Sequence, residues 1–313
     1  MTQPTLAHIH CPDAQGGHRM AYWLWGDAAA PHLVVCVHGL SRQGRDFDVL
    51  ARALLARAAA RGQALRVVCP DVVGRGESDW LKDPMGYQFP TYVGDMLALL
   101  AGLQAQAPIT TFDWVGTSMG GLIGLTLAGT PGLPLPAPLH RLVLNDVGPV
   151  IEWQALARIG QYLGQSGSFE SVEAAAAYMR EISAGFGPHS DAQWLALSRP
   201  MLKPAPGGGW RLHYDPAIAV PYAAMTPASA AEGEAALWQL YDRVQAETLV
   251  LRGAESDLLS AATAQAMQAR GPRPRVVELP GVGHAPTLVT ADQAALLLDF
   301  LLPAPAAAEG DTP

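Results

Sequence analysis

The feature that most constrains this 313-residue chain is the alternation of short apolar runs with segments of helical periodicity. Runs at 33–37, 65–69 and 111–116 have the length and composition of buried strands. Between them, apolar residues recur three or four positions apart, as in the segments 47–55 and 93–103. Because neighbouring parallel strands must be joined by long crossovers, this alternation predicts an α/β protein built on a mostly parallel sheet.

The alternation stops after Asp146. Residues 150–243 contain several short amphipathic patterns and the Pro/Gly-rich stretch KPAPGGGW, but no run typical of a parallel strand. Strand-like runs return at 248–253 and 274–281, with helical patterns between and after them. We therefore expect a mainly helical cap to be inserted into the chain of the sheet domain.

These changes of pattern set the expected domain limits. The α/β core should comprise residues 1–149 and 244–302, and the helical cap residues 150–243. The last residues, 303–313, read PAPAAAEGDTP and lack the apolar content that ordering requires, so we expect a disordered tail.

The segment from Gly116 to Gly120, GTSMG, matches the pattern G-x-S-x-G and lies between an apolar strand run and an apolar helical run. A serine on such a strand-to-helix turn adopts strained backbone angles and projects its hydroxyl above the sheet. The flanking glycines leave room where a Cβ would collide. This context predicts that Ser118 is a nucleophile.

A serine hydroxyl needs a positioned base, which favours a histidine at a later strand end. His284 follows the last predicted strand, within GVGHAP, and is the candidate general base. The acid that orients it should also follow a strand. Asp257, just past the run 248–253, is the preferred candidate, while Asp146 at the end of an earlier strand and Glu255 remain alternatives.

Attack on a carbonyl creates an oxyanion that requires preorganised N–H donors. The backbone N–H of Met119, directly after the nucleophile, is one candidate. The other is the N–H of Leu40, in the loop that follows the strand 33–37. His38, in the same loop, is expected to organise the loop and not to act as a second base.

The motifs together resemble the α/β-hydrolase superfamily, in its serine-nucleophile members with a helical cap. The matching segments are HGL at 38, DVVGRGESDW at 71, GTSMGG at 116, RGAESD at 252 and GVGHAP at 281. The resemblance covers about residues 20–302 and implies an eight-stranded, mostly parallel sheet with Ser118, Asp257 and His284 as the triad. In members of this superfamily, the loop that corresponds to the one beginning at Asp71 is usually structural.

Composition excludes other classes of function. The formal net charge is −8 and the 20 basic residues are scattered, which disfavours a nucleic-acid partner. Cys11, Cys36 and Cys69 have no metal-ligand spacing, and we expect neither a metal nor an organic cofactor. The absence of a long apolar run and of a signal-peptide pattern in the first 20 residues favours a soluble cytoplasmic protein without a membrane span.

The expected function is hydrolysis of a carboxylic ester of a small, mainly apolar substrate through an acyl-enzyme on Ser118. Serine at this position argues against the dehalogenases and epoxide hydrolases of the same fold, which use aspartate. Two alternatives remain. One is a C–C hydrolase of the meta-cleavage type, which would need a basic cap residue for a substrate carboxylate, and the other is a receptor that binds a small ligand without turnover. The basic cap residues available are Arg158, Arg180, Arg199 and Arg211.

Overall fold

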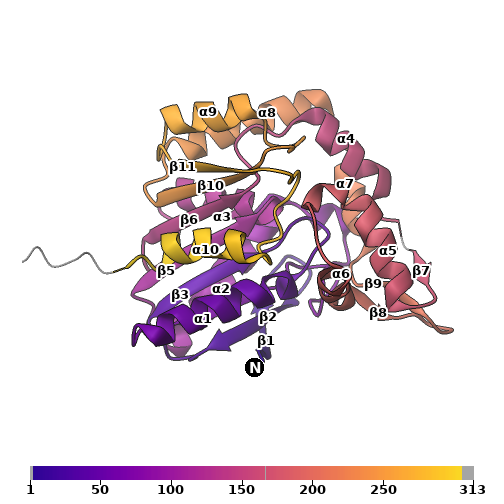
Figure 1. Ribbon diagram of the computed structural model, residues 1–313, viewed down its shortest axis with the longest axis horizontal. Helices are drawn as coiled ribbons and strands as arrows, with labels where there is room; N and C mark the ends of the chain where they lie inside the picture. Colours follow the sequence, from indigo (N-terminus) through magenta and orange to yellow (C-terminus); the bar gives the residue numbers. More distant parts are fainter. Residues whose placement is uncertain (1–2, 166, 305–313) are drawn as a thin grey trace, which may run out of the picture.

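The computed structural model describes residues 3–165 and 167–304. Within these residues, eight strands form one sheet (Figure 1). Their order is β1 (Thr5–Cys11), β2 (His18–Gly26), β4 (Arg66–Pro70), β3 (His32–Val37), β5 (Thr111–Thr117), β6 (Leu139–Asn145), β10 (Glu247–Gly253) and β11 (Arg275–Leu279). Strand β2 pairs antiparallel with β1 and β4, and the other neighbours pair parallel. The predicted fold class is therefore confirmed.

Helices cover both faces of the sheet because its parallel strands are apolar on both sides. In β3, Val34 and Cys36 belong to a core with α1 (Asp48–Ala60) and α10 (Ala291–Leu301). The opposite face packs against α2 (Phe89–Gln106), α3 (Met119–Gly129), α8 (Pro227–Tyr241) and α9 (Ala261–Ala269). No helix in the described part of the chain has the length and apolarity to cross a bilayer.

The segment between β6 and β10, where the cap is expected, is mainly helical, and we call it the cap below. It contains α4 (Trp153–Tyr162), α5 (Val172–Ile182), α6 (Asp191–Ser198) and α7 (Ala219–Ala223), which lie to one side of the sheet in Figure 1. It also contains a small antiparallel sheet that the sequence did not predict, formed by β7 (Ser168–Phe169), β9 (Trp210–Leu212) and β8 (Leu202–Pro204). The Pro/Gly-rich stretch forms the turn between β8 and β9, where the Ala205 N–H donates to the Gly209 carbonyl at 3.0 Å.

The domain limits proposed from the sequence remain a prediction. Helix α8, which falls within the predicted cap segment 150–243, packs against α3 of the core so closely that a Cβ on Gly129 would lie 2.2 Å from the Leu240 carbonyl oxygen. Of the predicted tail, residues 305–313 lie outside the described residues.

Candidate active site

Ser118 occupies the turn between β5 and α3, with backbone angles φ 52° and ψ −117°. The turn is so tight that a Cβ on Gly116 would lie 2.3 Å from the backbone of Gly120. A Cβ on Gly120 would lie 2.1 Å from the carbonyl oxygen of Val37. Only glycine fits at these two positions, which is the physical reason for the sequence pattern around the serine.

His284 lies in the loop after β11 and contacts the serine directly. Its Nε2 is 2.9 Å from the Ser118 Oγ, and its Nδ1 is 2.7 Å from the Oδ2 of Asp146. Because an ionised carboxylate only accepts hydrogen bonds, Nδ1 is assigned as the donor to Asp146. Nε2 is then left unprotonated and oriented to accept the proton of the serine hydroxyl.

Asp146 follows β6 directly, and its side chain is fully buried. Besides His284, its carboxylate accepts hydrogen bonds from the last residue of β10 and from the loop that follows it. The Gly253 N–H donates to Oδ1 at 2.8 Å, and the Ser256 hydroxyl donates to Oδ2 at 2.6 Å. Three donors therefore fix both carboxylate oxygens, and the imidazole is held in one orientation.

The prediction that Asp257 orients the histidine does not agree with this geometry. Asp257 points towards the cap, where the Nε and Nη2 of Arg158 on α4 donate to its two carboxylate oxygens at 2.6 and 3.0 Å. Its side chain is 45% exposed, and the alternative Glu255 is also exposed. The end of β10 and the loop after it contribute the Gly253 N–H and the Ser256 hydroxyl as donors to Asp146, and the carboxylate that contacts His284 follows β6.

The two predicted oxyanion donors border the serine. Leu40 lines the cavity above Ser118, and a Cβ on the neighbouring Gly39 would lie 3.7 Å from the Ser118 Cβ. Met119 begins α3, so its N–H precedes the first hydrogen bond of that helix. Across the described residues, neither the Leu40 N–H nor the Met119 N–H has an intramolecular acceptor among the loop, cap and side-chain hydrogen bonds. The assignment of these two N–H groups as oxyanion donors stays a prediction.

His38 organises the loop that carries Leu40. Its Nδ1 donates to the Gly39 carbonyl at 2.7 Å, and its Nε2 accepts the Val72 N–H at 2.9 Å. Burial lowers the pKa of His38 to about 3, so the ring stays neutral and keeps both hydrogen bonds. Asp71 plays a similar part and accepts the N–H groups of Gly44 and Glu77 at 2.7 and 2.9 Å.

A cavity of about 110 Å³ lies between the sheet and the cap and contains Ser118 and His284. Its walls are mainly apolar, and they come both from loops of the sheet domain and from the segment between β6 and β10. The apolar and aromatic residues that line it include Ile159, Tyr162, Tyr178, Met179, Ile182, Phe186, Leu197, Leu212 and Tyr214. Two arginines, Arg42 and Arg158, also reach it. The arrangement places a serine–histidine pair at the floor of a largely apolar chamber.

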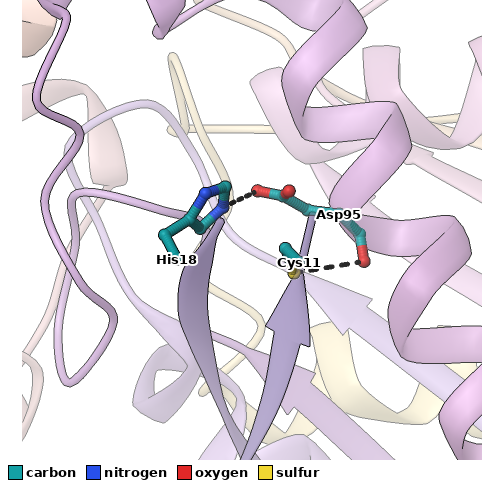
Figure 2. Close-up of side chains that lie close together, drawn as sticks. All are labelled: Cys11, His18 and Asp95. Atoms are coloured by element: carbon teal, nitrogen blue, oxygen red, sulfur yellow. Dashed lines mark hydrogen bonds and ion pairs between the residues drawn. The ribbon is translucent and has the colours of Figure 1, made fainter. Parts of the chain in front are cut away.

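A second polar cluster lies away from this cavity, between the β1–β2 hairpin and α2 (Figure 2). Cys11, His18 and Asp95 are buried and near enough to one another to suggest a metal site. However, His18 Nε2 is 3.0 Å from Asp95 Oδ2, and its Nδ1 is 3.1 Å from Asp13 Oδ2. The Cys11 thiol donates to the backbone carbonyl of Asp95, and burial raises the pKa of this thiol.

A carboxylate oxygen lies at each ring nitrogen, so when His18 is protonated both nitrogens donate and the ring fastens the hairpin to α2. Burial lowers the pKa of His18, but the hydrogen bonds and charges of Asp95 and Asp13 outweigh burial and raise it above the ordinary value. Because the pKa of His18 is higher in the folded than in the unfolded protein, its protonation stabilises the fold. This contribution is fully present at pH values below the unfolded-state pKa of about 6.5. The contribution is lost as the pH rises through the pKa of His18 in the folded protein.

We therefore expect His18→Gln to lower the free energy of unfolding by about 3 kcal/mol at pH 6, because it leaves a buried carboxylate without its cation. The difference from the unsubstituted protein should shrink as the pH is raised. Urea denaturation at a series of pH values measures it. The matched control is His8→Gln, which alters an exposed histidine of the same hairpin and should change nothing. A difference that does not vary with pH would contradict a charged His18.

Comparison with known proteins places this site in a family. The model of the alpha/beta hydrolase family matches residues 34–299. A 3-hydroxybutyrate-oligomer hydrolase of Cupriavidus necator is 48% identical over 300 residues, which are 95% of this chain and 97% of that protein. The crystal structure of an alpha/beta hydrolase from Novosphingobium aromaticivorans is 35% identical, with a TM-score of 0.80, over 97% of this chain and 100% of that one.

Proposed function

Because this chain belongs to the alpha/beta hydrolase family, we propose that it is a carboxylic ester hydrolase with a serine nucleophile. The observation that carries the proposal is the position of His284, which contacts the Ser118 hydroxyl through one ring nitrogen and the buried Asp146 through the other. This is the arrangement that activates a serine for acyl transfer.

In the proposed reaction, the Ser118 Oγ attacks the ester carbonyl carbon and its proton passes to His284 Nε2. The carbonyl oxygen becomes an oxyanion that accepts hydrogen bonds from the N–H groups of Leu40 and Met119. When the tetrahedral intermediate collapses, His284 protonates the departing alcohol and an acyl ester remains on Ser118. A water molecule, deprotonated by His284, then attacks this ester. As the acyl–oxygen bond breaks, His284 returns the proton to the Ser118 Oγ, and the acid is released.

The role proposed for Asp146 follows from its three hydrogen bonds. By accepting the Nδ1 proton, the carboxylate holds the imidazole in the tautomer whose Nε2 is free to act as a base. It also stabilises the imidazolium that forms when the serine loses its proton. Gly253 and Ser256 keep the carboxylate in place and so act through Asp146.

For the substrate we propose short linear oligomers of 3-hydroxybutyrate. The Cupriavidus necator relative, which matches almost the whole chain, is a 3-hydroxybutyrate-oligomer hydrolase. Each repeat presents a methyl group and an ester group. The apolar cap wall suits the methyl groups, and the Tyr162, Tyr178 and Tyr214 side chains add polar groups within that wall.

The test is turnover of chemically defined esters by the purified protein. A linear trimer of 3-hydroxybutyrate should be cleaved to monomer and dimer, detected by liquid chromatography with mass detection. A p-nitrophenyl ester of a short acid should also be cleaved. Two results would contradict the proposal: a dienoate ring-cleavage product turned over faster than every ester, or trimer bound without any product. The first would indicate a C–C hydrolase and the second a non-catalytic receptor.

A further inference from the structure

Arg75 is a cation that lies fully buried beside the proposed oxyanion donors. It belongs to the loop after β4 and forms no ion pair with any carboxylate in the described part of the chain. Buried charges in proteins are normally paired, because removing an ion from water costs several kcal/mol. An arginine in this state requires an explanation.

The N–H groups of the Arg75 guanidinium donate hydrogen bonds to uncharged oxygen atoms. Its Nε donates to the Leu40 carbonyl at 2.8 Å, and its Nη1 donates to the Val73 carbonyl at 2.7 Å and to the Tyr92 hydroxyl at 3.2 Å. The rings of Tyr87 and Tyr92 have their centres 5.7 and 5.2 Å from its central carbon. These contacts stabilise the cation without cancelling its charge.

Two of the contacts connect Arg75 to the site. Besides the bond to Leu40, its Nη2 lies 3.8 Å from the Met119 Sδ, a weak acceptor. Leu40 and Met119 are the residues whose N–H groups are free to bind an oxyanion. Leu40 lies in the loop after β3 and Met119 is the first residue of α3, so the single guanidinium contacts two separate segments of the chain.

We propose that Arg75 is a positioning residue for the oxyanion hole, which fixes Leu40 relative to Met119 and adds positive potential behind the developing negative charge. This inference rests on the proposed ester hydrolysis. A charge in a dry interior is weakly screened, so it stabilises an oxyanion more than a neutral carbonyl. Stabilisation confined to the transition state raises kcat and leaves KM unchanged. A carboxylate partner would cancel the potential, which accounts for the absence of one.

The test compares Arg75→Gln, which removes the charge, with Arg75→Lys, which keeps it. We expect Arg75→Gln to lower kcat for the 3-hydroxybutyrate trimer about 10- to 100-fold, with KM changed less than about twofold. Arg75→Lys should retain at least ten times the kcat of Arg75→Gln. A second readout is inhibition by a trifluoromethyl ketone, which adds to the serine and forms an oxyanion. Its affinity should fall in Arg75→Gln by the same factor as kcat/KM.

Arg66 provides the matched control. It is also fully buried, and among residues 3–165 and 167–304 it has no ion pair. It donates to the Ala28 and Ala107 carbonyls at 2.9 Å each, far from Ser118 in the fold. Arg66→Gln should lower the melting temperature and leave kcat unchanged. The inference is overturned if Arg75→Gln and Arg75→Lys have equal kcat, or if KM rises while kcat is kept. Failure of the unsubstituted protein to cleave any ester would instead refute the proposed function.

Discussion

Replacing Ser118 by alanine is expected to lower kcat for the 3-hydroxybutyrate trimer by about 10⁶-fold, because the hydroxyl that forms the acyl ester is lost. The hydroxyl is the only part of the side chain that is lost, and its hydrogen-bond partner is the His284 Nε2. Binding of the trimer should persist, since the cavity walls are untouched. Single-turnover kinetics and calorimetric binding measure the two quantities on the same preparation.

Ser183→Ala is the matched control for this prediction. Ser183 also lines the cavity, but the hydroxyl that contacts His284 is that of Ser118. We expect this variant to keep kcat within about threefold, since an isolated polar contact contributes little to the reaction. Equal losses in the two variants, or activity retained by Ser118→Ala, would show that Ser118 is not the nucleophile.

Replacing Asp146 by asparagine is expected to lower kcat by about 10⁴-fold. An amide in this position no longer favours a proton on Nδ1 of His284, so the ring adopts the tautomer that cannot accept the serine proton. The hydrogen bond of 2.7 Å between Nδ1 and Oδ2 is the contact that is altered. Steady-state kinetics at neutral pH, with a melting curve to establish folding, measures the effect.

Asp257→Asn tests the competing assignment directly. Its carboxylate is half exposed and pairs with Arg158 at the edge of the cap, and exposed ion pairs contribute at most about 1 kcal/mol. We expect kcat to stay within about fivefold of the unsubstituted value. The opposite pattern, with activity kept by Asp146→Asn and lost by Asp257→Asn, would show that Asp257 is the acid that orients His284.

The comparison of the two aspartates shows what local sequence can and cannot predict. Ser118 and His284 carry strong local signals, namely glycines around a strand-to-helix turn and a glycine-rich loop after the last strand, and the structure brings the two together. Asp146 and Asp257 both follow strands, and β6 and β10 are neighbours in the sheet. Which one reaches the histidine depends on how the loop after β10 turns, and that is set by tertiary contacts.

Other features missed from the sequence have the same cause. Strand β1 alternates exposed and partly buried residues at the sheet edge, so its pattern resembles a polar loop. The small sheet of the cap is made of strands of two or three residues, too short for any periodicity. Arg75 gave no signal either, because its role depends on two loops that meet only in the folded chain.

Labelling with a fluorophosphonate, followed by peptide mass spectrometry, tests the central claim most directly. The reagent forms a stable ester with a serine only where a base has activated the hydroxyl. The arrangement of Ser118, His284 and Asp146 predicts one adduct, on Ser118, formed much more slowly in Asp146→Asn. An adduct on Ser41 or Ser183, which also line the cavity, or no adduct at all, would contradict it.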